Sequence, residues 1–364
     1  MEKIESSGDI ISKGVTSENA AYGNKVLTQW LIPSIHPAYA RLFCAHLKNE
    51  GVDLDIIFKG SCLSWKELMT QKGFISFEQF QRLISNAINY TQCPWLGLKI
   101  STMIQVSAHG PLGYGALAAQ TVRDSFKLVE KSLGTRLSIY HFNLIEKDSR
   151  ALFQLKEMFD PGEAREFIFT TLLGSFLDLL EKTSGHIGEG VLVLFPYDEP
   201  EWSDLYAKRF ANIQLVFGRD RFEIDMPSSM LDAYCLTADE FAYRNAVREC
   251  DALLDQKNQG GDLSSRIKVE LFKAQAPYPS QAQIAQHFNM SSRTLIRKLK
   301  LEGSSYQSLL DEVRKELACW YLQNSAKSIE QIADIIGFQD TSNFSRVFRR
   351  WLDCKPSEFR GQAG

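Results

Sequence analysis

The chain has 364 residues, of which 44% are hydrophobic and 23% are charged, an ordinary globular composition with enough length for two or three domains. No run of about 18 apolar residues occurs, so no membrane-spanning helix is predicted. The formal net charge of −3 is unevenly distributed, since residues 262–364 hold 15 Lys and Arg against 11 Asp and Glu. A basic end on an acidic chain is typical of a module that binds a polyanion.

Residues 1–24 are polar and lack the apolar core of a secretory signal, so we predict a disordered leader. Seven cysteines are scattered along the chain without a C-x-x-C pair, which argues against a disulfide framework and a zinc site. We therefore expect reduced thiols filling core space in a cytoplasmic protein, and neither a metal nor another cofactor. The cysteines are Cys44, Cys62, Cys93, Cys235, Cys250, Cys319 and Cys354.

Helical and strand-like patterns alternate over residues 25–237, which predicts one α+β domain. Ser76 and Gln79 have the spacing of a helix capping box. Amphipathic or apolar patterns predict helices over residues 33–49, 76–90, 111–120, 123–133, 162–182 and 199–210. Apolar-rich segments predict a hairpin from residues 138–146 and 151–159, and further strands over 191–195, 212–217 and 221–225.

A polar stretch with two glycines, Gly260 and Gly261, follows a predicted helix over residues 238–256. Such a composition is typical of a flexible linker. We predict a linker helix and flexible linker over residues 238–261, and an all-α domain over residues 262–364.

This C-terminal part contains an internal repeat at a spacing of 48 residues, in which Ser280-Gln281-Ala282-Gln283-Ile284-Ala285 matches Ser328-Ile329-Glu330-Gln331-Ile332-Ala333. Each copy begins with the Ser and Gln spacing of a capping box. Each short helix ends near a residue that tolerates left-handed backbone, Asn289 in one copy and Gly337 in the other. Two helices joined by such a turn form a helix-turn-helix.

The second helices of the two copies also correspond. Leu295 and Leu299 match Phe344 and Phe348 on an apolar face. The opposite faces carry cationic and hydroxyl side chains, which suit a DNA major groove. Charge is common on any exposed helix, but its repetition in two matched copies favours DNA binding. A connecting helix over residues 306–323 would direct both recognition helices into successive major grooves about 34 Å apart.

From residue 262 to residue 360 the chain resembles the AraC/XylS family of bacterial transcription regulators. The most specific stretch runs from Ile329-Glu330-Gln331-Ile332-Ala333 through Gly337-Phe338-Gln339-Asp340 and Phe344-Ser345-Arg346-Val347-Phe348-Arg349-Arg350 to Lys355-Pro356-Ser357-Glu358-Phe359-Arg360. Asp353 and Cys354 stand where the family often has Gly. The resemblance implies two helix-turn-helix units that read an asymmetric site in double-stranded DNA, and activation through contact with RNA polymerase.

The resemblance also indicates which side chains contact DNA. The expected contacts are Arg293, Thr294, Ile296, Arg297 and Lys300 in the first unit, and Thr341, Ser342, Ser345, Arg346 and Arg349 in the second. All of these except Thr294, Lys300 and Arg349 are expected to face bases. Ile296 is apolar and could touch a thymine methyl group without a hydrogen bond.

The N-terminal part resembles the effector domain of a branch of the family that lacks the cupin-like barrel, best at His109-Gly110-Pro111-Leu112-Gly113-Tyr114-Gly115-Ala116-Leu117. The resemblance implies a small-molecule effector and a homodimer. Candidate effector-binding residues are His109, Tyr114, Arg136 and Arg165, the arginines because they can pair with a carboxylate. The ordinary alternative is that His109 caps a helix and the arginines pair with Glu163 or Glu166. A fatty acid and an amino-acid-like effector both stay open.

No catalytic residue is predicted, because the sequence lacks the G-x-S-x-G, H-E-x-x-H, P-loop and G-x-G-x-x-G motifs. Cys93 and Cys250 also lack the neighbouring His and Arg that a reactive thiol of a DNA-repair methyltransferase needs. Two alternatives to an effector-controlled activator stay open. One is a dimeric DNA-binding regulator without a ligand, and the other is a thiol-based redox sensor or an enzyme fused to a helix-turn-helix.

Overall fold

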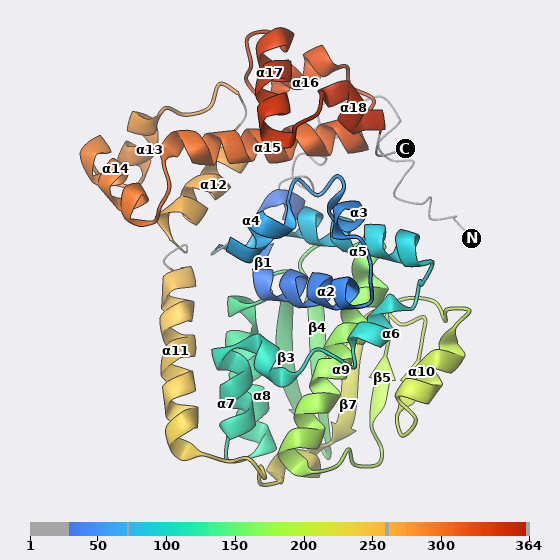
Figure 1. Cartoon of the computed structure of the whole chain (residues 1–364). Coiled ribbons are helices and arrows are strands. Elements are labelled where there is room, and N and C mark those ends of the chain that lie inside the picture. Colours follow the sequence, from blue (N-terminus) through green and yellow to red (C-terminus); the bar gives the residue numbers. More distant parts are fainter. Residues whose placement is uncertain (1–28, 71–72, 259–261, 275, 362–364) are drawn as a thin grey trace. The chain divides into compact units, whose positions relative to one another are not determined.

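The computed structural model describes residues 29–70, 73–258, 262–274 and 276–361. The predicted leader and the Gly pair of the linker lie outside these residues. The chain forms two compact units. The sheet unit comprises residues 34–57 and 83–259, and the helical unit comprises the described parts of residues 1–33, 58–82 and 260–364 (Figure 1). The segment 58–82 thus packs with the C-terminal helices, while the predicted linker helix falls in the sheet unit.

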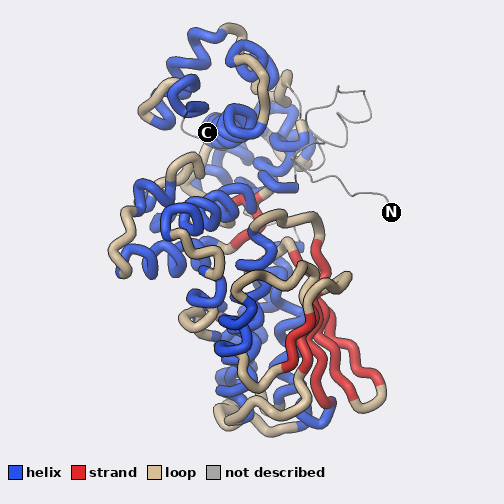
Figure 2. Tube along the Cα trace, turned by 90° about the vertical axis from the view of Figure 1, so that its right-hand side faces the viewer, coloured by secondary structure: helices blue, strands red, loops and turns tan. Residues whose placement is uncertain are grey.

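The sheet unit is built on a five-stranded sheet with the strand order β3-β4-β7-β5-β6 (Figure 2). Its strands are β3 Tyr140–Lys147, β4 Arg150–Glu157, β5 Leu192–Leu194, β6 Gln214–Val216 and β7 Phe222–Pro227. The pair β5–β6 is parallel and the other neighbours are antiparallel. The predicted hairpin is confirmed: β3 and β4 pair from Tyr140 opposite Glu157 to Lys147 opposite Arg150.

The long helix α9, Ala164–Ser184, packs its aromatic side chains against the sheet. The ring of Phe169 stacks on that of Phe222 in β7 at a centroid distance of 4.5 Å. Phe176 meets Phe153 of β4 edge to face at 4.9 Å. This burial explains why the predicted helix 162–182 is apolar over most of its circumference rather than along one stripe.

Shorter helices complete the sheet unit. They are α2 Pro37–Asn49, α3 Leu54–Phe58, α5 Phe77–Thr91, α6 Leu96–Ile100, η1 Val106–His109, α7 Pro111–Ala118, α8 Val122–Ser132, η2 Leu133–Thr135, α10 Ser203–Arg209, η3 Ser228–Asp232 and α11 Glu240–Asn258; α3 and α5 have residues in both units. The predicted capping box is confirmed, because the Ser76 backbone N–H donates to Gln79 and the Gln79 N–H donates to the Ser76 hydroxyl.

Two helix starts were predicted wrongly. The helix predicted over residues 199–210 begins only at Ser203. Residues 33–49 were expected to be helical throughout, but Pro33–Ile35 form strand β1 and the helix begins at Pro37. Proline at the first helical position fits there, and it forces the preceding residue, His36, into extended backbone.

The helical unit contains the predicted all-α segment. Its elements are α4 Trp65–Thr70, β2 Ile75–Ser76, α12 Leu263–Lys273, α13 Gln281–His287, α14 Ser292–Leu301, α15 Tyr306–Asn324, α16 Ile329–Ile335, α17 Thr341–Leu352 and α18 Pro356–Gly361. Its core joins Leu295 and Leu299 of α14, Val313 of α15, and Phe344 and Phe348 of α17. The described residues after 262 form helices and connections without strands, as predicted.

The expectation that all cysteines are reduced is wrong for one pair. Cys62 and Cys319 form a disulfide between residues 257 positions apart in the chain. Sequence spacing could not reveal this pair, because the fold alone brings the segment 58–82 onto α15. The other thiols are free, with Cys354 half-buried and the remaining four buried.

No helix within the described ranges is both long and apolar enough to cross a membrane.

Candidate nucleic-acid interface and ligand cavity

The first predicted helix-turn-helix is formed by α13 and α14. The Ser280 N–H donates to Gln283 Oε1 at 2.7 Å, and the Gln283 N–H donates to Ser280 Oγ at 3.3 Å. Asn289 holds a left-handed φ of 53° in the turn. Ser291 then caps α14 by accepting from the Thr294 N–H at 3.2 Å. The sequence signals thus fix both ends of the turn.

The second unit, α16 and α17, repeats this construction. Ser328 and Gln331 form the reciprocal capping box at 2.8 and 3.1 Å. Gly337 takes a φ of 77° in the turn. The cap of α17 is Asp340, which accepts from the Asn343 N–H at 2.6 Å. The internal repeat is therefore a repeat of structure, with Asp in place of Ser at the second recognition-helix cap.

Helix α14 separates apolar and cationic side chains onto opposite faces. Leu295 and Leu299 are fully buried, whereas Arg293, Arg297 and Lys300 are exposed and form no ion pair with the described residues. Ile296 is 52% exposed on the same helix. Thr294 is half-buried, and its hydroxyl bonds that of Ser291 within the cap.

Helix α17 has the same division. Phe344 and Phe348 are fully buried. Of the predicted contacts, Ser342, Arg346 and Arg349 are exposed, and Thr341 and Ser345 are half-buried. The Arg346 guanidinium donates to Asn343 Oδ1 at 3.1 Å, one helical turn earlier.

A basic groove lies along α17 and the start of α18. Its lining residues are Ile329, Ser345, Arg346, Arg349, Arg350, Lys355, Pro356 and Ser357. Sequence reasoning missed Arg350, Lys355 and Ser357, although the adjacent Arg pair and the Lys before Pro356 signalled them. Arg350 is also 3.6 Å from Asp311. Cationic and hydroxyl side chains around a groove are suited to phosphate oxygens.

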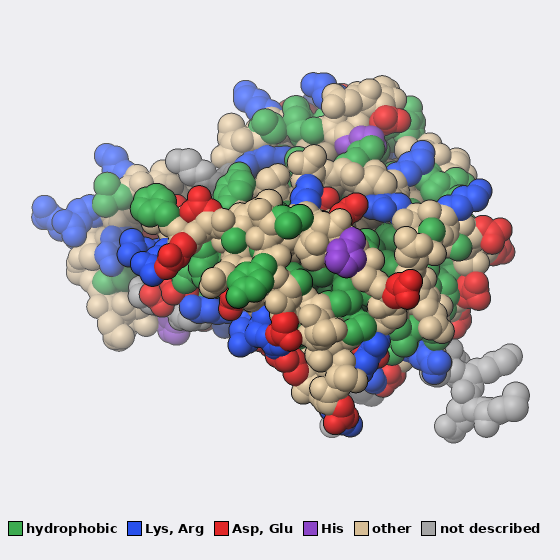
Figure 3. Space-filling model, turned by 90° about the horizontal axis from the view of Figure 1, so that it is seen from below, with side chains coloured by type: hydrophobic (Ala, Val, Ile, Leu, Met, Phe, Trp, Pro, Cys, Tyr) green, Lys and Arg blue, Asp and Glu red, His purple; other side chains and the backbone are tan. Residues whose placement is uncertain are grey.

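The surface view places basic side chains at the other helix-turn-helix too. In Figure 3, Lys and Arg side chains gather at the left edge, where Figure 1 places α14. Elsewhere on that face they are interspersed with Asp and Glu. A local cluster of one sign attracts a polyanion, whereas interspersed charges do not.

Helix α15 joins the two helix-turn-helix units and fixes the second turn through Arg314. The Arg314 guanidinium donates to the carbonyls of Ile336 and Gly337 at 3.0 and 3.1 Å. It also lies over the rings of Tyr278 and Phe338, with its carbon 5.3 and 5.0 Å from the two centroids. A straight helix of this length measures about 28 Å, close to one turn of duplex DNA. Sequence reasoning did not identify Arg314.

The sheet unit contains a cavity with an almost wholly apolar lining. The space in which the centre of a water-sized sphere can move has a volume of ≈ 80 Å³. It is lined by aliphatic side chains of α7, α8 and α9 and by five phenylalanines, namely Phe126, Phe142, Phe153, Phe176 and Phe222. Polar side-chain atoms come only from His109 and Ser175 among the lining residues.

The structure brings together two of the four predicted effector-binding residues. His109 accepts or donates a hydrogen bond at Nδ1 to the Tyr39 hydroxyl, 2.7 Å away. The Arg136 guanidinium donates to the Ala108 carbonyl at 2.9 Å and lies over the Tyr39 ring. Burial and the nearby Arg136 charge lower the pKa of His109 to about 4, so this imidazole is neutral near pH 7.

The other two candidates lie elsewhere. Tyr114 is 58% exposed on α7 and does not line the cavity. Arg165 pairs with Glu157 at 2.9 Å and with Asp160 at 2.8 Å. The alternative stated above, that Arg165 forms an ion pair, is correct, but the expected partners were Glu163 or Glu166. The local spacing did not indicate Glu157, which lies at the end of a paired strand.

No cluster of three or more His, Cys, Asp and Glu side chains within the described ranges could hold a metal ion.

Comparison with known proteins gives two matching family models. Residues 51–234 match the arabinose-binding domain of AraC transcription regulator, and residues 284–362 match a helix-turn-helix domain. The chain is 29% identical over 323 residues to the ornithine utilization regulator of Pseudomonas aeruginosa, which covers 89% of this chain and 95% of that protein.

It is 24% identical over 273 residues to the transcriptional regulator VqsM of the same species, covering 72% of this chain and 83% of VqsM. A crystal structure of the transcriptional regulator CdpR from P. aeruginosa aligns over 76% of this chain and 91% of its own, with 22% identity and a TM-score of 0.39.

Proposed function

Because the chain belongs to the AraC family of DNA-binding transcription regulators and is not an enzyme, we propose that α14 and α17 are its two recognition helices. Each enters the major groove, and the two read successive turns of one duplex. The single observation that carries this proposal is the repeated division of these helices into a buried apolar face and an exposed face with cations. On α14, Arg293 and Arg297 find no acidic partner among the described residues.

The exposed side chains divide into two roles. Arg293, Ile296 and Arg297 of α14, with Thr341, Ser342, Ser345 and Arg346 of α17, face base edges, where Arg is suited to guanine and Ile to the thymine methyl group. Thr294, Lys300 and Arg349 contact the sugar-phosphate backbone of the DNA. The basic groove adds Arg350 and Lys355 as phosphate contacts, which position the helix without reading sequence.

Selection of bound fragments from host genomic DNA, followed by hydroxyl-radical footprinting, tests this function. Two protected stretches on one side of the duplex, one helical turn apart, are expected. Arg297→Ala should remove protection in one stretch and Arg346→Ala in the other. Lys273→Ala serves as the matched control, because Lys273 is exposed, lies on α12 rather than on a recognition helix, and pairs with Glu270. Protection that depends on neither arginine contradicts the proposal.

We further propose that a small-molecule effector bound in the sheet unit controls this regulator, which acts in the cytoplasm as a homodimeric activator that contacts RNA polymerase. The matched arabinose-binding model and the cavity beside His109 support a ligand site in this unit. Transcription in vitro from a selected fragment, with purified polymerase and with host metabolite extract, tests the control. Transcription should rise with both protein and extract; repression, or indifference to the extract, contradicts it.

A further inference from the structure

We propose that the cavity of the sheet unit binds a small amphipathic carboxylic acid, with its hydrocarbon part among Phe126, Phe153 and Phe176 and its carboxylate at the His109 end. This inference rests on the proposed effector control and names the chemical class of the effector. It departs from the sugar that the name of the matched family model suggests.

The lining of the cavity favours hydrocarbon over a polyol. The Ser175 hydroxyl already donates to the Thr171 carbonyl at 3.2 Å, which leaves His109 as the main polar group available to a ligand. A sugar carries a hydroxyl on almost every carbon, and each hydroxyl buried without a hydrogen-bond partner weakens binding. A water molecule needs about 10–15 Å³ of such space, so a cavity of ≈ 80 Å³ takes a group several times larger.

The buried cation Arg136, beside His109, is 7% exposed and forms no ion pair with a described carboxylate. The Asp178 carboxylate, which also acts on His109, is bound by the Val106 N–H at 3.2 Å and by Lys182 at 2.9 Å. The Arg136 Nε is buried without a hydrogen-bond partner, while Nη2 donates to the backbone carbonyl of Ala108, next to His109. An unpaired charge in the interior is costly. An anion at this end of the cavity would supply the missing charge.

Hydrogen bonds connect this cation to the cavity wall. The Arg136 guanidinium lies over the Tyr39 ring, 5.9 Å from its centroid. The Tyr39 hydroxyl is 2.7 Å from His109 Nδ1, and we infer that it donates to this nitrogen. His109 then carries its own proton on Nε2, the ring nitrogen left to donate to a carboxylate. Arg136, Tyr39 and His109 thus form a polar end for an otherwise apolar cavity, the arrangement that an amphipathic acid requires.

Isothermal titration calorimetry and thermal unfolding of the full chain test this inference with decanoate, decan-1-ol, L-arabinose and L-ornithine. Decanoate should bind and raise the melting temperature. Decan-1-ol should bind about ten- to a hundredfold more weakly, because it lacks the charge that pairs with Arg136. Arg136→Gln should remove this preference for the acid while keeping alcohol binding. Binding of arabinose or ornithine with no response to decanoate overturns the proposal.

Cavity-filling variants separate this site from adventitious binding. Leu172→Trp narrows the cavity, and its half-exposed position gives the larger ring room to adjust. It should abolish binding of both decanoate and decan-1-ol. Leu42→Trp on α2, 42% exposed and outside the cavity, is the control and should bind as the wild type does. Decanoate binding that survives Leu172→Trp overturns the site. DNA binding is also measured without ligand. If the chain binds DNA but not decanoate, the ligand-site proposal fails while the recognition-helix proposal stands.

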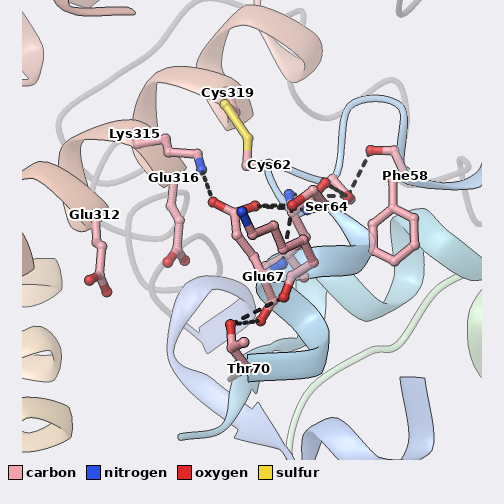
Figure 4. A network of polar contacts seen from close by, with 12 residues as sticks. Phe58, Cys62, Ser64, Glu67, Thr70, Glu312, Lys315, Glu316 and Cys319 are labelled. Atoms are coloured by element: carbon pink, nitrogen blue, oxygen red, sulfur yellow. Dashed lines mark hydrogen bonds and ion pairs between the residues drawn. A yellow bond between two sulfur atoms is a disulfide. The ribbon is translucent and has the colours of Figure 1, made fainter. Parts of the chain in front are cut away.

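A different observation carries a second inference. We infer that Cys62 and Cys319 are a redox-sensitive cross-link that fixes segment 58–82 to α15, the helix between the two helix-turn-helix units. Figure 4 shows Cys319 above Cys62 and Lys315 directed at Glu67. Lys315 Nζ is 3.6 Å from Glu67, and Gln323 donates to the Gly60 carbonyl at 3.1 Å.

The contacts on α15 lie on one face of the helix. Lys315, Cys319 and Gln323 are spaced by four residues, so their side chains point the same way. Each contacts segment 58–82. When the cross-link forms, the two thiols lose two protons and two electrons to a low-molecular-weight disulfide, which is cleaved to two thiols while the bond between the two Sγ atoms forms. Reduction reverses these steps and leaves only the polar contacts.

Thiol alkylation with peptide mass spectrometry, and DNA affinity measured in parallel, test the switch. With glutathione disulfide, a peptide joining Cys62 to Cys319 should appear, and with dithiothreitol it should disappear. The affinity for a selected DNA fragment should differ severalfold between these states. Cys319→Ala should abolish the difference, whereas Cys354→Ala, which removes a free thiol, should retain it. Complete alkylation of both cysteines under oxidant, or equal affinities in both states, overturns the inference.

Discussion

The two helix-turn-helix units share their caps and turns but differ in what holds each recognition helix. Helix α14 is anchored by two leucines, Leu295 and Leu299. Helix α17 is anchored by aromatic rings of other elements. Phe348 contacts Phe359 of α18 at a centroid distance of 5.5 Å, and Phe344 and Trp351 contact Phe338 of the turn at 5.5 and 6.2 Å. Aromatic pairs add about 0.5–1.5 kcal/mol beyond their burial. The second recognition helix is thus held more firmly than the first, although both present a similar cationic face.

The largest expected effect comes from truncating these anchors. Phe348→Ala should lower the free energy of unfolding of the helical unit by about 3–5 kcal/mol, because it leaves a large void and breaks three ring contacts. Leu299→Ala should cost less, about 2–4 kcal/mol, since fewer atoms are lost. Urea unfolding followed by circular dichroism measures both. Equal costs would contradict the firmer hold on α17.

The turns provide the next comparison. Arg314 makes two hydrogen bonds to the second turn and stacks on two rings. Arg266 lies over Phe288 at the end of α13, with its guanidinium carbon 4.6 Å from the ring centroid. We expect Arg314→Ala to destabilise the unit by about 2–3 kcal/mol and Arg266→Ala by about 0.5–1 kcal/mol.

Hydrogen exchange locates the loss, which should concentrate at residues 336–338 in Arg314→Ala. Arg314→Lys is the informative companion, because an ammonium group cannot donate to both carbonyls in the planar geometry of a guanidinium. If the lysine variant is as stable as the wild type, the clamp acts through charge alone, and this account of the second turn is wrong.

Part of the structure of the two helix-turn-helix units could be predicted from the sequence. What could not be predicted has a physical reason. The caps, the turns and the apolar stripes of both units were predictable because they depend on residues three or four positions apart. Arg314 and the cysteine pair were not, because they act between elements distant in the chain.

The same distinction holds in the sheet unit. The hairpin of β3 and β4 was predicted from two short apolar-rich segments close together in the chain, but its neighbour β7 lies far along the sequence. Of the candidate ligand residues, His109 and Arg136 lie close together in the fold. Arg165 instead forms an ion pair with Glu157 at the end of β4. The sequence suggested candidate residues by type, but it could not show which partners the fold gives them.

Arg297 of α14 and Arg346 of α17 occupy equivalent positions in the two units. Arg297→Ala and Arg346→Ala should each weaken binding to a selected fragment by about 1–3 kcal/mol and relax base preference locally. The loss should be smaller for Arg346, because its guanidinium already has a hydrogen bond to Asn343 in the free protein, and this bond must be exchanged on binding. Fluorescence anisotropy with base-substituted fragments measures both effects.

A uniform loss across unrelated sequences would instead make these arginines phosphate contacts. The double variant Arg346→Ala with Asn343→Ala refines the test. If the hydrogen bond to Asn343 restrains Arg346, removing Asn343 alone should tighten binding slightly and have no effect once Arg346 is absent. A further loss in the double variant would mean that Asn343 itself contacts DNA.

The smallest expected difference is between the two capping boxes, which are alike in residues and nearly alike in geometry. Ser280→Ala and Ser328→Ala should each cost about 1 kcal/mol, because each leaves the N–H of the third helical residue without its acceptor. Urea unfolding gives the values, and Ser→Gly variants at both sites should cost only a few tenths of a kcal/mol. Each cap depends on neighbouring residues, whereas the anchors of the recognition helices involve distant ones. If Ser280→Ala and Ser328→Ala lower the free energy of unfolding by different amounts, the contacts that stabilise α17 also stabilise α16. Equal effects would confine the difference between the two units to the recognition helices and the clamp on the second turn.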